Sequence, residues 1–170
     1  MKLKGIYRTI IILFVLALNV GCDQVTKSMM RSHITYYDHY SFFDGHVTLL
    51  NVENTGAFLS MGDKLAAPYR FVLLTVLPLL ALLSGLVYII IKNTFSKIAL
   101  LGIICVIGGG LGNLYDRVMH GSVTDFMHIK FGVFQTGVFN AADVSIMVGV
   151  GLMIVDSLTN KRQQPKLLEL

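Results

Sequence analysis

Two aspartates in this apolar chain have the residue type and position for acid–base chemistry. Asp125 follows the third apolar segment, in Gly121-Ser-Val-Thr-Asp-Phe126, and Asp143 lies near the start of the fourth, in Phe139-Asn-Ala-Ala-Asp-Val-Ser-Ile146. Ionisable side chains at membrane depth are costly, so they are usually paired and functional. Two carboxylates that meet can share one proton, which suits acid–base hydrolysis. The pair therefore predicts a hydrolytic site at a membrane face.

Simpler interpretations exist for each aspartate. Asp143 can cap the fourth helix. A role in capping alone does not explain why this carboxyl group has apolar neighbours such as Phe139 and Val144. Asp125 can stabilise the turn at Gly121. A rival function is that of a small transporter or channel subunit, in which the carboxylates relay protons or cations. The five histidines form no HExxH motif, so the sequence gives no support for a zinc peptidase and predicts no metal site.

The composition places the chain in the membrane class. Of its 170 residues, 54% are hydrophobic and 14% are charged, whereas a soluble domain has roughly 25% charged residues. Four apolar segments approach the ~20 residues that a helix needs to cross the hydrocarbon core: about 6–25, 71–91, 98–114 and 138–158. We therefore predict one domain over residues 1–170, an all-α membrane protein with four transmembrane helices joined on one side by connections at 27–68 and 115–137.

The basic residues predict the orientation of these helices. Eight of the fourteen Lys and Arg residues fall on the side opposite the two long connections: Lys2, Lys4, Arg8, Lys92, Lys97, Lys161, Arg162 and Lys166. Cytoplasmic loops are enriched in such residues, so both termini are predicted to be cytoplasmic. Asp125 and Asp143 then lie near the outer face.

The first outer connection carries signals for a small β-sheet. Asp44-Gly45 is typical of a hairpin turn, and the following segment, 47–52, is rich in β-prone residues. Aromatic residues at 36–43 are of the kind that gathers at a membrane interface. The segment 126–131 alternates apolar and polar residues, which favours a further strand. We expect a sheet on the outer face.

Two features of the helices allow more than one interpretation. The glycines at 108–112 favour close helix packing over a phosphate-binding loop, because they lie within an apolar span. Gly21-Cys22 resembles the end of a lipoprotein signal peptide. Asn19 stands where such signals usually have an aliphatic residue, and three more spans follow, so we favour an uncleaved first helix over a lipid-anchored precursor. Pro78 is expected to disturb the second helix.

Three polar pairs share helix faces through i, i+3 or i, i+4 spacing: Asp23 with Lys27, Asn113 with Asp116, and Asn140 with Asp143. The first pair is either an interfacial anchor or part of a site. Asp116 and Arg117 are adjacent, so they are either a structural pair that ties the outer loop to the helix, or Arg117 holds a carboxylate in its charged state.

Taken together, the sequence resembles the lipoprotein signal peptidases (signal peptidase II), which are bacterial membrane aspartic peptidases. The matching segments are Asp23-Gln-Val-Thr-Lys27, Asn54-Thr-Gly-Ala57, Gly109-Gly-Leu-Gly-Asn-Leu-Tyr-Asp-Arg117, Val123-Thr-Asp-Phe126 and Phe139-Asn-Ala-Ala-Asp143. In place of the Ala and aromatic residue that often follow the Gly-Ala, this chain has Phe58 and Leu59, so no substrate contact is carried over to either.

The resemblance implies an activity and a set of site residues. It implies that Asp125 and Asp143 form the catalytic dyad, without a cofactor. It implies that the site is shaped or supported by Asp23, Lys27, Asn54, Gly56, Asn113, Asp116, Arg117 and Asn140. The expected substrate is a prolipoprotein cut just before its diacylglyceryl-modified cysteine. The expected location is the bacterial cytoplasmic (inner) membrane, in contact with lipid and not with nucleic acid.

Overall fold

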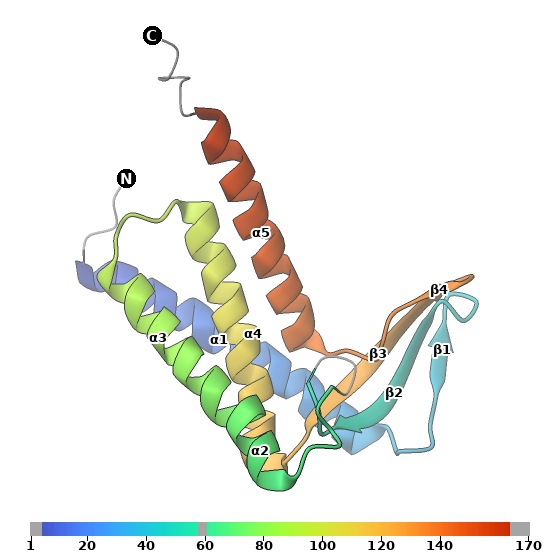
Figure 1. The fold of residues 1–170 in the computed structure, drawn as a ribbon. Coiled ribbons are helices and arrows are strands. Elements are labelled where there is room, and N and C mark those ends of the chain that lie inside the picture. The colour runs from blue at the N-terminus through green and yellow to red at the C-terminus, as the bar shows by residue number, and fades with distance from the viewer. Residues whose placement is uncertain (1–4, 58–60, 164–170) are drawn as a thin grey trace.

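The structure, a computed structural model, describes residues 5–57 and 61–163, with 161–163 described as backbone only. Its helical elements are α1 (Gly5–His33), α2 (Ala67–Phe71), the π-helical turn η2 (Val72–Val76), α3 (Leu77–Ile91), α4 (Lys97–His120) and α5 (Ala141–Gln163). Its strands are β1 (Tyr40–Phe42), β2 (Val47–Asn54), β3 (Val123–Phe131) and β4 (Phe134–Gln135). The helices form a bundle, and the sheet extends from one end of it (Figure 1).

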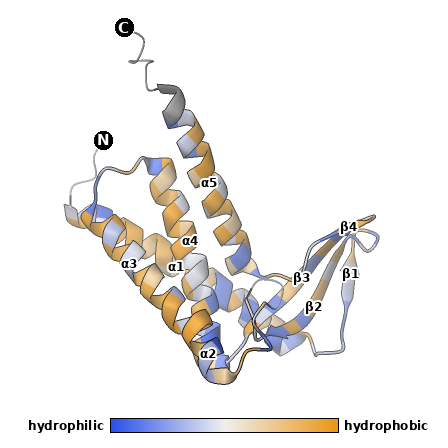
Figure 2. Cartoon of the chain, viewed as in Figure 1, coloured by the Kyte–Doolittle hydropathy of each residue, from blue (hydrophilic) through white to orange (hydrophobic). Residues whose placement is uncertain are grey.

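Four helical stretches are long and apolar enough to cross a membrane: Gly5–His33, Ala67–Ile91, Lys97–His120 and Ala141–Asn160. In Figure 2 the ribbons of these helices are mostly orange, the colour of hydrophobic residues. Large apolar side chains such as Phe14, Leu80 and Met147 are more than half exposed, as expected for helices whose surroundings are lipid. The prediction of a four-helix membrane protein with a small sheet is confirmed.

The predicted boundaries were too short at the outer end of the bundle. α1 continues past residue 25 to His33, and α4 continues past residue 114 to His120. The apolar pattern ends earlier because these extensions carry the polar residues that face one another inside the protein. α5, in contrast, starts at Ala141 rather than 138, since the preceding residues pair with β3 through the bridge of Phe139 to Met127. The outer connections therefore span 34–66 and 121–140.

Polar contacts tie the helices together at the end opposite the sheet. Arg8 of α1 is 8% exposed and donates to the backbone carbonyls of Ile90 and Lys92 at the end of α3. A cation at a helix C-terminus satisfies unpaired carbonyls and complements the helix dipole. Ser96 caps α4 and also donates to Asp156 of α5. The start of α1 and the end of α5 lie at this same end (Figure 1). Of the predicted cytoplasmic cations, Lys2, Lys4 and Lys166 lie outside the described residues.

α4 is the central helix, and its glycines let α1 and α5 approach it closely. A Cβ added at Gly108 would lie 2.8 Å from Asn19 of α1, and one added at Gly112 would lie 2.5 Å from Asp23 of α1. A Cβ at Gly109 would lie 2.3 Å from the carbonyl oxygen of Ala142 in α5. The packing interpretation of these glycines is therefore confirmed.

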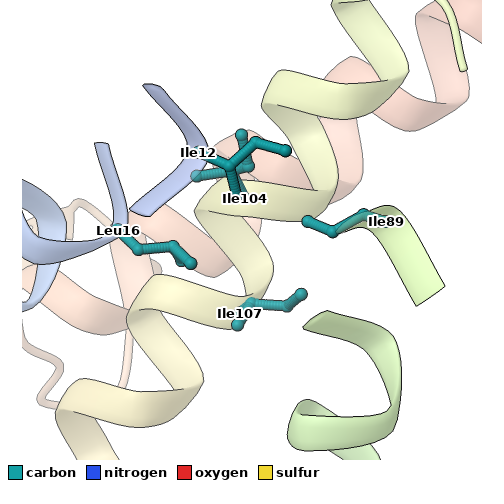
Figure 3. Packing of buried hydrophobic residues seen from close by; sticks show 5 residues of the cluster. All are labelled: Ile12, Leu16, Ile89, Ile104 and Ile107. Carbon is teal, nitrogen blue, oxygen red and sulfur yellow. The ribbon is translucent and has the colours of Figure 1, made fainter. Parts of the chain in front are cut away.

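The inner half of the bundle has an apolar core. Its buried members come from α1, α3 and α4 and are Ile12, Leu16, Ile89, Ile104 and Ile107 (Figure 3). Near it, Asn19 donates to Ser145, whose hydroxyl donates to the carbonyl of Cys105. Asn19, the residue that departs from a lipoprotein signal, thus links α1 to α5, and α1 is continuous through the exposed Cys22.

The second membrane span changes its helical geometry before Pro78. Residues 72–76 form the π-helical turn η2, where the N–H of Leu77 donates to the carbonyl of Val72. Proline has no N–H and its ring clashes with the carbonyl four residues earlier, which here belongs to Leu74. A π-type turn removes the need for that hydrogen bond. The disturbance expected from Pro78 is therefore present, one turn before the proline itself.

The outer sheet has the order β1-β2-β3-β4, and each pair of neighbours is antiparallel. The β1–β2 connection uses positive φ at Phe43, Asp44 and Gly45, so the hairpin predicted at Asp44-Gly45 is confirmed. In the β2–β3 pair, Val52 lies opposite Asp125 and Glu53 opposite Thr124. Successive residues point to opposite faces of a sheet. Asp125 and Thr124 therefore face different parts of the molecule.

Candidate active site

Asp143 is held by a reciprocal cap at the start of α5. Its backbone N–H donates to Oδ1 of Asn140 at 3.0 Å, and its own Oδ2 accepts from the backbone N–H of Asn140 at 3.1 Å. This is a capping box, which fixes both side chains relative to the first helical turn. The other carboxylate oxygen, Oδ1, accepts from Nδ2 of Asn113 at 2.9 Å. Asp143 therefore caps its helix and also faces α4.

Asp125 projects from β3 toward the same asparagine. It is 4% exposed, and its two carboxylate oxygens accept from Nδ2 of Asn140 at 2.6 Å and from Nδ2 of Asn54 at 3.0 Å. Burial raises the pKa of Asp125 to about 6; the nearby Asp143 charge acts in the same direction, and the two amide hydrogen bonds act against it. Asn140 thus connects the two carboxyl groups directly.

Lys27 determines how Asn113 presents its amide. The Lys27 ammonium has only donors, and it donates to Oδ1 of Asn113 at 2.8 Å. Asn140 Nδ2 donates to the same oxygen at 3.1 Å. The amide nitrogen of Asn113 must then point the other way, toward Asp143. A lysine on α1 therefore orients a hydrogen-bond donor to the carboxyl group on α5.

A cluster of four charged residues, three of them buried and the fourth, Arg31, 25% exposed, lies on the α1 side of the pair. Lys27 contacts Asp23 at 2.8 Å and Asp116 at 3.0 Å, and Arg31 contacts Asp116 at 2.9 Å. Lys27 and Asp116 are 0% exposed and Asp23 is 1% exposed. Asp23 also accepts from the backbone N–H of Ala142 at 2.9 Å, so it satisfies a free donor in the first turn of α5. We name this set (Asp23, Lys27, Arg31 and Asp116) the charged cluster.

Arg117 joins α4 to the turn after β2. Its Nη2 donates to the carbonyl of Gly56 at 2.7 Å, and the N–H of Gly56 donates to Oδ1 of Asn54 at 3.0 Å. Arg117 forms no ion pair within 4.0 Å among residues 5–57 and 61–160. The interpretation of Asp116 and Arg117 as a pair is therefore wrong: Asp116 turns to α1 and β3, and Arg117 alone ties the outer loop to the helix.

An apolar groove of about 310 Å³ reaches this network from the membrane-spanning helices. Its wall is formed mainly by apolar residues of η2, α3 and α4, with Ile146 of α5. At one end lie Asn113, which binds Asp143, and Arg117. We name it the apolar groove. An apolar segment lying in it would end at Asn113, one hydrogen bond away from the Asp143 carboxyl group.

The structure connects all ten residues predicted for the site through hydrogen bonds and ion pairs. Phe58 and Leu59 lie outside the described residues. In the part of the chain that is described, no group of three or more His, Cys, Asp or Glu residues is arranged to hold a metal ion. Two acids held by neutral amides beside an apolar groove are suited to sharing and transferring a proton.

Sequence reasoning missed a set of residues whose hydrogen bonds join α1 to β2, β3 and α4. Arg31 Nε donates to the Thr124 hydroxyl at 2.7 Å, and that hydroxyl donates to Glu53 at 2.7 Å. Gln24 donates to Asp116 and to the carbonyl of Gly112. Arg31 lies four residues after Lys27, on the same helix face, which was an available signal. Glu53 gave none, because its partner comes from a strand 71 residues away.

The fold and the site define a class: a four-helix membrane protein with a pair of carboxyl groups beside an apolar groove. The sequence model of the signal peptidase (SPase) II family matches residues 14–159. The chain belongs to this family and is therefore a peptidase.

Known proteins of the same kind match most of the chain. It is 33% identical to a lipoprotein signal peptidase of Maridesulfovibrio salexigens, over 82% of this chain and 89% of that one. It is 31% identical to one of Borrelia hermsii, over 94% of both chains. A solved structure described as a bacterial membrane enzyme has a TM-score of 0.79 and 25% identity, over 99% of this chain and 98% of the other. The peptidase is thus favoured over the transporter alternative.

Proposed function

We propose that this chain is an aspartic endopeptidase that removes signal peptides from prolipoproteins by cleaving just before the diacylglyceryl-modified cysteine. The catalytic dyad is Asp125 and Asp143. One observation carries the proposal: the side-chain amide of Asn140 donates to the Asp125 carboxyl group and the backbone N–H of Asn140 donates to the Asp143 carboxyl group, so the two carboxyl groups are fixed relative to one another. Two neighbouring carboxyl groups cannot both ionise easily, so the pair retains one proton.

The surroundings of the two aspartates indicate which one acts as the acid and which as the base. Asp125 keeps the proton, because burial raises its pKa to about 6. Asp143 lies in the first turn of α5, where the helix dipole and the backbone N–H of Asn140 stabilise a negative charge. Asp143 therefore takes a proton from a water molecule, which attacks the scissile carbonyl carbon. Asp125 donates a hydrogen bond to the carbonyl oxygen, and a proton then passes to the leaving amine.

The other site residues hold this geometry. Asn54 and Asn140 position Asp125, and Asn113 positions Asp143 under the control of Lys27. Asp23 and Asp116 balance the charge of Lys27 and join α1 to the start of α5 and to β3. Arg117 and Gly56 fix the turn that carries Asn54. Their role is to position the dyad and the substrate beside it.

The proposal places the reaction at the outer face of the bacterial cytoplasmic (inner) membrane, with both termini cytoplasmic. The basic residues at the other end of the bundle support this orientation. The apolar groove supports a substrate whose signal peptide and lipid chains stay at membrane depth while the scissile bond meets water at the dyad. Residues 1–170 act as one integral membrane unit in contact with lipid, and nucleic acid has no part in the function.

The test is cleavage of a diacylglyceryl-modified prolipoprotein by the purified protein. Wild type is expected to cut before the modified cysteine. Asp125→Asn and Asp143→Asn are each expected to lose about 10²–10⁴-fold in kcat, since each removes a proton-transfer group. Asp38→Asn is the matched control, because Asp38 lies in the outer connection and, within the described part of the chain, its carboxyl group accepts only from Thr35. A wild type that does not cut, or either dyad variant cutting at the wild-type rate, would overturn the proposal.

A further inference from the structure

A second cavity adjoins the proposed active site on its outer side. It has a volume of about 180 Å³ and lies between the turn after β2, the α2–η2 segment and the end of α4. Its polar lining consists of Thr55, Arg70, Thr75 and Arg117. We name it the outer pocket. Its character differs from that of the apolar groove, whose wall is almost wholly hydrocarbon.

The outer pocket carries two positive charges and no negative one. Arg70 and Arg117 both line it, and no Asp or Glu does among the residues that the structure describes. Neither arginine forms an ion pair within 4.0 Å among the residues whose side chains are described. Arg70 donates to a backbone carbonyl, that of Asp63. The buried Nε of Arg117 has no hydrogen-bond partner in the same part of the chain. Unpaired guanidinium groups in a cavity favour an anionic ligand.

The outer pocket and the apolar groove meet at two shared residues. Leu74 and Arg117 line both cavities. The groove continues from Arg117 to Asn113, the residue that donates to Asp143. On the pocket side, Arg117 donates to Gly56, which bonds to Asn54, a donor to Asp125. A chain that passes the dyad therefore moves from an apolar cavity into a cationic one.

We infer that the outer pocket receives the polar segment of the prolipoprotein just after the scissile bond, and that Arg70 and Arg117 make the enzyme prefer an acidic side chain there. The inference rests on the proposed function. The substrate has an apolar signal peptide before the bond and a polar chain after it, and the two cavities have the same order of character. A phosphate of a lipid headgroup shares the anionic chemistry, but the pocket is joined to the dyad through Arg117, which favours the peptide.

The experiment varies the charge on the substrate. Diacylglyceryl-modified prolipoproteins that differ only in Asp, Asn or Lys at the first or second residue after the cysteine are cut by the wild-type enzyme in neutral lipid. At one of these positions kcat/KM is expected to fall from Asp to Asn to Lys by roughly threefold or more at each step, the size expected of a partly solvated charge pair. Added salt is expected to narrow the difference.

Variants at Arg70 identify the pocket as the cause. Arg70→Gln is expected to bring kcat/KM for the Asp substrate close to that for the Asn substrate in the same variant, and Arg70→Lys is expected to restore part of the difference. Arg70→Glu is expected to favour the Lys substrate. Lys64→Gln, which removes an exposed charge outside the pocket, is the matched control and is expected to keep the Asp preference.

The outcomes separate this inference from the proposed function. Equal cleavage of the three substrates, or an Asp preference that survives Arg70→Gln, overturns the role of the pocket while the peptidase function stands. An Arg70→Gln effect that depends on anionic lipid and not on substrate charge also overturns it, in favour of a headgroup site. Failure of the wild type to cut any of the substrates overturns both.

Discussion

The charged cluster and the carboxyl pair are neighbours, yet their acids are held in opposite ways. In the charged cluster, Asp23 and Asp116 are each within 3.0 Å of a lysine or arginine nitrogen. In the pair, Asp125 and Asp143 accept from amide groups and have no cation within 4.0 Å among the side chains that the structure describes. The ion pairs keep Asp23 and Asp116 ionised, whereas the amide hydrogen bonds allow Asp125 and Asp143 to bind and release a proton.

This difference follows from the energetics of buried charge. Two acids and two bases in the charged cluster cancel, and removal of one partner leaves a charge that the interior cannot solvate. Neutral amides stabilise a carboxylate without forcing it to stay ionised. The charged cluster therefore acts as a rigid frame, and the pair it supports stays free to change protonation.

The largest effect is expected from Lys27→Met, which breaks the frame. Methionine fills a similar volume but leaves Asp23 and Asp116 without the ammonium that contacts both. Loss of one partner of a buried ion pair costs about 3–5 kcal/mol, a large part of the stability of an ordinary domain. The unfolding temperature in detergent is expected to fall steeply. Cleavage is expected to fall as well, because Asn113 loses the group that orients its amide.

Two further variants test whether the loss comes from unpaired charge. Adding Asp23→Asn to Lys27→Met removes one of the stranded acids, so the double variant is expected to lose less stability than the sum of the two single ones. Lys97→Met removes an exposed lysine at the start of α4 and is expected to leave the unfolding temperature unchanged. Additive losses would mean that the charged cluster does not act as a unit.

A smaller loss of stability is expected from Gly112→Ala, which introduces a steric clash with the charged cluster without removing a charge. The added Cβ would lie 2.5 Å from Oδ2 of Asp23, so α1 or α4 must shift. Such overpacking costs about 1–3 kcal/mol. Gly21→Ala is the matched control on α1, since a Cβ there has no neighbour within 4 Å, and it is expected to be neutral or stabilising by up to about 1 kcal/mol. Equal unfolding temperatures for both variants would contradict the close approach at Gly112.

The contrast between the two regions also explains what the sequence could predict. Helix-face spacing identified Asp23 with Lys27 and Asn140 with Asp143, because i, i+3 and i, i+4 neighbours lie on one helix whatever the tertiary fold. The apolar runs and the Asp44-Gly45 turn likewise predicted the four spans and the hairpin, since hydrophobic length and turn chemistry are local properties.

Contacts between distant segments could not be predicted in this way. One of the two interpretations offered for Asp116 paired it with the adjacent Arg117, but the fold brings it Lys27 and Arg31 from α1. The outer ends of α1 and α4 were missed because polar residues there face inward, which reverses the usual relation between polarity and exposure. Arg70 carried no local signal at all, since its place beside Arg117 depends on how α2 packs against α4.

The smallest expected effect is a change in the pH dependence of cleavage. This measurement tests the protonation of Asp125 and Asp143 and does not involve the charged cluster. With Asp125 as the acid, kcat/KM is expected to fall as the pH rises through about 6, because the protonated fraction of Asp125 falls there. Asn54→Ala removes a hydrogen bond that stabilises the Asp125 carboxylate. The charged form is then less stable, the pKa of Asp125 rises further, and the fall moves to higher pH, by about half to one unit for one such bond.

The matched control is Asn51→Ala on the same strand. Asn51 donates to the carbonyl of Ile34 and not to Asp125, so its removal is expected to leave the fall near pH 6. A profile that is flat from acid to neutral pH would contradict proton sharing by the pair. If the fall stays near pH 6 in Asn54→Ala and the acid limb of the profile moves to higher pH instead, Asp125 is the base and the roles of Asp125 and Asp143 are exchanged. The limb that moves therefore decides which aspartate donates the proton.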